Sequence, residues 1–186
     1  TEELDALWTK FNPWLGTPHS PTARIGCALG ESLLASPNSK NAKRALGIFK
    51  EVETKAWSQS DRERAKVGRL QAVLASGNAG EAMREAKDLA LNKENFTLLI
   101  QAKFIMAQAR HKDFLRFLKE NPRWNEDPIA TPARHQLYDE VLELYLFPAL
   151  FMGSEGESAA RGLWGEVEIY RESGGTPLAI ETCGDI

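Results

Sequence analysis

The residues of this chain that could do chemistry are three histidines, two cysteines and scattered carboxylates. His19, His111 and His135 stand far apart in the sequence, and none belongs to an HExxH pair or has metal-ligand neighbours. Cys27 and Cys183 form neither a CxxC motif nor a zinc spacing, and both occupy positions where a small buried side chain is expected. We therefore expect surface or turn histidines, buried cysteines, no metal site and no catalytic residue.

Motifs that hold nucleotides or activate a serine are absent as well. The segment 153–156 lacks the GK[ST] ending of a phosphate-binding loop, and GxSxG does not occur. Asp139 with Glu140, and Glu166 with Glu168, fall on segments predicted to be helical, where a solvated face is the common arrangement. The sequence predicts no cofactor, no small-molecule substrate and no enzymatic activity within these residues.

The elements that must position any site are predicted to be helices. The 186 residues include 23 Ala and 22 Leu but only 5 Val and 8 Ile, a choice of side chains that favours helix over sheet. The longest apolar stretch, Leu142–Met152, is interrupted by Glu143 and Pro148, so no membrane insertion is expected. The fold class is therefore all-α.

Charge excludes one class of partner and leaves another open. The net charge of −3 gives no global attraction to nucleic acid, and the basic run 40–69 lacks aromatic residues spaced as a stacking platform. Residues 1–123 carry 20 basic and 14 acidic side chains, whereas residues 124–186 carry 3 and 12. This asymmetry indicates either unequally solvated helix faces or contact with a charged partner, including a second copy of the chain.

Caps, glycines and prolines divide the chain into short amphipathic helices. A segment bearing Trp8 and Trp14 is expected to pack on the first helix pair, and Trp57 and Trp124 to cover helix ends. The predicted helices are 21–33, 41–55, 60–76, 80–91, 94–109, 112–120, 134–151, 158–173 and a last one from 176.

Three of the helix pairs share one spacing of small and apolar residues. The offsets 4, 3, 4, 5 and 4 occur in each pair, with a turn at the step of five, and the first residues of the pairs are separated by 32 and 65 positions. The three sets are Lys66, Leu70, Val73, Gly77, Ala82, Ala86; Leu98, Ala102, Ile105, Ala109, Phe114, Leu118; and Leu163, Val167, Tyr170, Gly174, Ala179, Cys183.

This spacing resembles the tetratricopeptide repeat (TPR) family, most closely at Tyr170, Gly174, Ala179 and Ile180. The resemblance implies α-α hairpins stacked as a right-handed superhelix over residues 21–186, preceded by an N-terminal extension, 1–20. Another α-solenoid and a helical bundle remain open as alternatives.

In such arrays the first helices of the hairpins line a concave groove that binds peptides. Carried onto this chain residue by residue, the resemblance implies groove positions of mixed polarity, without the lysine and asparagine of a carboxylate clamp. These positions are Val67, Gln71, Leu99, Lys103, Tyr138, Leu142, Trp164 and Glu168.

The expected function is a non-catalytic scaffold that binds a protein, a peptide or its own copies. The alternative is a helical accessory domain of a larger enzyme or of a secretion or envelope assembly whose chemistry lies outside this chain. Because the chain begins at Thr1, we expect that a segment was removed, and the compartment of this soluble chain, cytoplasmic or exported, stays open.

Overall fold

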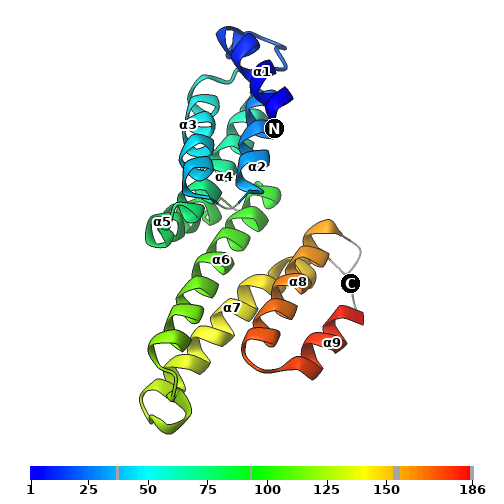
Figure 1. Cartoon of the computed structure of the whole chain (residues 1–186). Coiled ribbons are helices and arrows are strands. Elements are labelled where there is room, and N and C mark those ends of the chain that lie inside the picture. The colour runs from blue at the N-terminus through cyan, green and yellow to red at the C-terminus, as the bar shows by residue number, and fades with distance from the viewer. Residues whose placement is uncertain (37, 93, 153–155, 185–186) are drawn as a thin grey trace. The chain divides into compact units, whose positions relative to one another are not determined.

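The structure, a computed structural model, describes residues 1–36, 38–92, 94–152 and 156–184, and all regular structure within them is helical. The all-α prediction is confirmed. The chain forms two compact units, Thr1–Glu85 and Ala86–Ile186 (Figure 1). The first unit contains α1 (Glu2–Phe11), a 3₁₀ helix (Asn12–Trp14), α2 (Thr22–Leu34), α3 (Ser39–Lys55) and α4 (Gln59–Ala75), and the unit boundary falls within α5 (Ala79–Ala90).

Phe49 is the centre of the first unit. Its ring, fully buried on α3, lies against Gly30 of α2 and Gly68 of α4. A Cβ atom would come within 2.5 Å of the ring at Gly30 and within 2.3 Å at Gly68, so only glycine lets the three helices approach this closely. Trp8 attaches α1 to α2 in the same way, because a Cβ on Gly26 would lie 2.5 Å from its indole.

Polar side chains cap the N-termini of α3 and α4. Asn38 accepts a hydrogen bond from the Asn41 amide at the start of α3, and Ser58 accepts one from the Asp61 amide at the start of α4. The cap of α4 is therefore Ser58, two residues before the predicted start of this helix at 60. The predicted turn at Gly77 is confirmed, since this residue adopts a φ of +94° and α4 and α5 follow each other directly.

The second unit contains α6 (Phe96–Glu120), a 3₁₀ helix (Trp124–Glu126), α7 (Ala130–Met152), α8 (Glu157–Glu172) and α9 (Thr176–Gly184). Its core joins Phe104 and Phe114 of α6 to Val141 of α7 and Ile169 of α8. The ring of Tyr145 on α7 lies against α8, where a Cβ on Gly165 would come within 2.4 Å of it. The helices of this unit therefore pack in chain order (Figure 1).

The predicted break between 109 and 112 is wrong. Residues Phe96 to Glu120 form one helix of 25 residues, and the partner of this helix is α7. The residue predicted to occupy the turn is Ala109, the best helix former, and it is buried in mid-helix together with His111. With neither glycine nor proline near this point the helix continues, so Phe114 and Leu118 lie on the same helix as Leu98 and the second predicted hairpin does not form.

The last predicted hairpin is confirmed in its helices and its turn. Gly174 has a φ of +87°, and the Gly175 amide donates to the Tyr170 carbonyl at 2.8 Å, which ends α8. The prediction that Cys183 is buried is wrong. The covered face of α9 runs through Ala179 and Thr182, and Cys183 lies beside that face, exposed.

Candidate functional site

The predicted groove residues of the first unit lie on α4. Val67 is buried, whereas Gln71 is half-buried one turn further along the helix. Arg64 lies about one turn before Val67 and two turns before Gln71 on the same helix, so the three residues lie along one face of α4.

The predicted groove residues of the second unit differ in their surroundings. Tyr138 and Leu142 pack against the core, and the Tyr138 ring lies 6.0 Å from that of Phe114. The Lys103 ammonium lies 5.0 Å above the Phe147 ring, a cation–π contact. Trp164 stands on α8 with 54% of its surface exposed, while Leu99 and Glu168 are half-buried. Trp164 is thus the aromatic of this set that is open to solvent.

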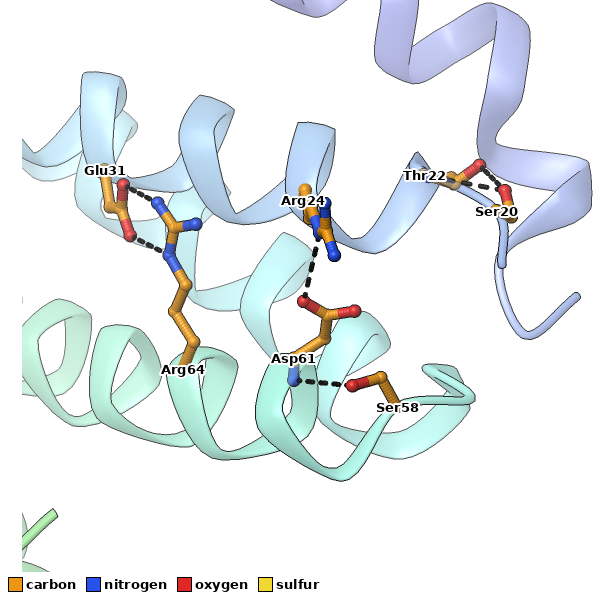
Figure 2. A network of polar contacts seen from close by, with 7 residues as sticks. All are labelled: Ser20, Thr22, Arg24, Glu31, Ser58, Asp61 and Arg64. Atoms are coloured by element: carbon orange, nitrogen blue, oxygen red, sulfur yellow. Dashed lines mark hydrogen bonds and ion pairs between the residues drawn. The ribbon is translucent and has the colours of Figure 1, made fainter. Parts of the chain in front are cut away.

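Two ion pairs connect α2 to α4 on the surface of the first unit (Figure 2). Arg64 holds Glu31 with two hydrogen bonds, from Nε at 2.8 Å and from Nη2 at 2.6 Å. This contact raises the pKa of the Arg64 guanidinium. Arg24 lies much farther from its partner, with 4.0 Å between its Nε and the Asp61 Oδ1. The second pair is therefore loose where the first is bidentate.

The loose pair borders a pocket of about 250 Å³. The pocket lies among the loop 16–21, the first turn of α2 and the connection between α3 and α4. His19, Arg24, Trp57, Ser58 and Asp61 contribute its aromatic, charged and hydroxyl groups. A concave site with a few converging polar groups is the usual form of a binding site.

The loop beside the pocket is fixed by backbone conformation and by hydrogen bonds. Gly16 has a φ of +102°, and a Cβ there would lie 2.7 Å from the Lys55 carbonyl oxygen, so the loop passes directly over the end of α3. The Ser20 hydroxyl accepts from the Thr22 amide at 3.3 Å, and the Thr22 hydroxyl donates to the Phe11 carbonyl at 3.2 Å. The loop therefore presents a defined wall.

His19 and Trp57 form the aromatic part of that wall. His19 has a φ of +61°, a conformation that non-glycine residues rarely adopt and that recurs at functional sites. Its ring lies 5.1 Å from that of Trp57, whose surface is 55% exposed. Trp57 follows the end of α3 as predicted, and its indole remains largely open to solvent beside the pocket.

A second polar cluster lies inside the second unit. His111 contacts the Tyr145 hydroxyl through Nδ1 at 3.2 Å and the Glu172 carboxylate through Nε2 at 2.5 Å. Burial raises the pKa of the Tyr145 phenol well above its ordinary value. The prediction of a surface or turn histidine is wrong for His111, which joins α6 to α7 and α8.

Cys27 is buried in the core of the first unit. Burial raises the pKa of the Cys27 thiol to about 12, so it stays protonated and unreactive at neutral pH. Among the described residues, no group of three or more His, Cys, Asp or Glu side chains is arranged to hold a metal ion.

Comparison with family models, with curated proteins and with solved structures gives no match for this chain. Within the part of the chain that the structure describes, no helix combines the length and the apolar character needed to span a membrane.

Proposed function

We propose that this chain is a non-catalytic helical-repeat scaffold that binds a protein segment or a second copy of itself. The observation that carries the proposal is the set of large apolar side chains left exposed on three consecutive helices of the second unit. They are Leu150 and Phe151 on α7, Trp164 on α8, and Leu178 and Ile180 on α9.

A contiguous exposed apolar patch marks an interaction site, and these five side chains lie on helices that pack as neighbours. Trp164 is the strongest candidate anchor, because tryptophan is enriched among the residues that dominate binding energy. Its neighbour Gly165 lies under the Tyr145 ring, so the tryptophan stands on a tightly packed helix. A rigid support lowers the entropy lost when a partner binds.

We further propose that the hairpins stack as TPR-like repeats. Support comes from the turns at Gly77 and Gly174, which both have positive φ and both follow the first helix of a predicted hairpin. The pairs α2 with α3, α6 with α7, and α8 with α9 each pack as neighbours in their own unit. In this frame α2, α4, α6 and α8 are first helices, the elements that line the groove in the TPR family.

Peptide selection combined with light scattering tests the proposal. A display library of random peptides is selected on the immobilised chain, and the recovered peptides are titrated against the chain and its Trp164→Ala variant. Trp14→Ala is the matched control, because Trp14 is similarly exposed but lies in the first unit. We expect Trp164→Ala to weaken binding by tenfold or more, about 1.4 kcal/mol, and Trp14→Ala to have little effect.

Self-association is measured on the same preparation by size-exclusion chromatography with light scattering at low and high salt. A salt-sensitive dimer would identify the partner as a second copy, held by opposite charge. A monomer at both salt concentrations, together with no selected peptide that depends on Trp164, would refute the proposed function.

A further inference from the structure

We propose that the pocket of the first unit binds the guanidinium or ammonium group of a basic side chain on a partner segment, held between the Trp57 indole and the Asp61 carboxylate. This inference rests on the proposed function, because it assigns the chemistry of one side chain of the partner.

The first observation is a carboxylate that is mostly covered but weakly paired. The Asp61 side chain is only 17% exposed, and its ion-pair partner is Arg24, whose Nε lies 4.0 Å away and whose own side chain is 77% exposed to solvent. Arg64 also interacts with Asp61 electrostatically, but its hydrogen bonds go to Glu31. On the same two helices Arg64 and Glu31 are joined by two hydrogen bonds. Asp61 therefore has room for a second, closer cation, which would gain a charge-assisted hydrogen bond.

The second observation is the aromatic surface beside that carboxylate. The Trp57 indole is 55% exposed and lines the same pocket as Asp61. Cations bind over an indole face more strongly than over other aromatic rings, and the gain increases where water is excluded. The His19 ring at 5.1 Å limits the orientations open to the indole.

The third observation is the pocket itself, which is built before any ligand arrives. Its volume of about 250 Å³ accommodates the end of a long side chain. Its wall is fixed at Gly16 and His19, which both have positive φ, and by the hydrogen bonds of Ser20 and Thr22. A preformed site of this kind loses little entropy on binding.

Arg24 acts in this arrangement as a displaceable internal cation. The incoming basic group would take its place beside Asp61, and the mostly exposed Arg24 side chain would turn into solvent (Figure 2). Removing the Arg24 charge should therefore strengthen binding of a basic ligand. Removing the same charge would weaken binding of an acidic ligand, because that ligand would need Arg24 as its partner. The effect of an Arg24 variant on affinity therefore has opposite signs for basic and acidic ligands.

The test uses the whole chain and two capped tripeptides, acetyl-Gly-Arg-Gly-amide and acetyl-Gly-Glu-Gly-amide. The signal is the NMR shift of the Trp57 indole N–H, identified by its loss in Trp57→Phe. We expect a saturable shift with the arginine peptide and none with the glutamate peptide. Affinity should fall about tenfold in Asp61→Asn and rise about threefold in Arg24→Gln.

Asp5→Asn is the matched control, because it removes a carboxylate from the Arg44 ion pair between α1 and α3, and neither residue of that pair lines the pocket. Its affinity for the arginine peptide should stay within about twofold of that of the unmodified chain. If Asp61→Asn fails to fold by circular dichroism, Arg24→Gln and the comparison of the two peptides still decide the question.

Preference for the glutamate peptide, or weaker arginine binding in Arg24→Gln, would overturn the proposal in favour of an anion site. Absence of any Trp57 shift would overturn it as well. Selected peptides that depend on Trp164 but leave Trp57 unperturbed would refute this pocket and leave the proposed function standing. An arginine peptide bound at Trp57, with no peptide that depends on Trp164 and a monomer at both salt concentrations, would support this pocket and refute the Trp164 surface of the proposed function.

Discussion

Replacing Gly68 by alanine tests how tightly Phe49 is held between α2 and α4. The added Cβ would lie 2.3 Å from Cε1 of the ring, where carbon atoms normally approach to about 3.5–4.0 Å. The ring cannot simply retreat, because a Cβ on Gly30 would meet it at 2.5 Å on the α2 side. Accommodation therefore requires α4 to move away from α3.

The magnitude follows from two opposing terms. Alanine stabilises a helix interior by about 1 kcal/mol relative to glycine. Overpacking a closed core costs about 1–3 kcal/mol, and the required shift of more than about 1 Å places Gly68→Ala at the upper end. We expect the free energy of unfolding to fall by about 2 kcal/mol.

Urea unfolding followed by circular dichroism measures this change, with Gly47→Ala as the matched control. Gly47 lies on the exposed side of α3, where a Cβ would meet no atom within 4 Å, so this change should stabilise by up to about 1 kcal/mol. Shortening the ring in Phe49→Leu should reduce the penalty of Gly68→Ala in the double variant. A Gly68→Ala protein as stable as Gly47→Ala would refute the packing described for Phe49.

Three further outcomes follow from the structure. Trp164→Ala should lower the melting temperature only slightly, because the side chain is 54% exposed, and a loss of about 3 kcal/mol or more would instead identify a buried residue. The hydrogen bond from Arg69 lowers the pKa of Glu85, so this pair stabilises the fold above the unfolded-state pKa of Glu85. That stabilisation is lost as the pH falls through the lower pKa of the folded state. Glu85→Gln should therefore make stability, followed by circular dichroism, less dependent on pH below about pH 4.5. With a thiol reagent at pH 8, Cys183 should react in the folded chain and Cys27 only after unfolding, and equal rates would contradict the buried position of Cys27.

Helix positions could be predicted well because the signals that fix them are local. Gly77 and Gly174 each act within one turn of the chain, and a sequence window contains everything they need. The same reasoning failed at Ala109, where the repeat spacing called for a turn but no residue breaks a helix. A spacing that fits a helix pair also fits one long helix when the turn position holds alanine.

The pocket could not be predicted, because its parts lie far apart in the sequence. His19 and Asp61 are separated by 42 positions, and they line one cavity only after α2 and α4 pack together. His111 and Glu172 meet in the same way, although 61 positions separate them in the sequence. Gly16 is the one part of the pocket wall whose turn-forming role could be expected from residue type. The left-handed conformation of His19, three residues later, cannot be inferred from the sequence.

One packing device occurs in both units and bears on the repeat proposal. Phe49 on α3 packs against Gly68 of α4, and Tyr145 on α7 packs against Gly165 of α8. In each case one helix places an aromatic ring on a glycine of the helix that follows, 19 and 20 positions later in the chain. The recurrence favours an internal repeat whose members are α2 with α3 and α6 with α7, each followed by the first helix of the next hairpin. In both units the missing Cβ lets two successive helices approach within the thickness of one ring.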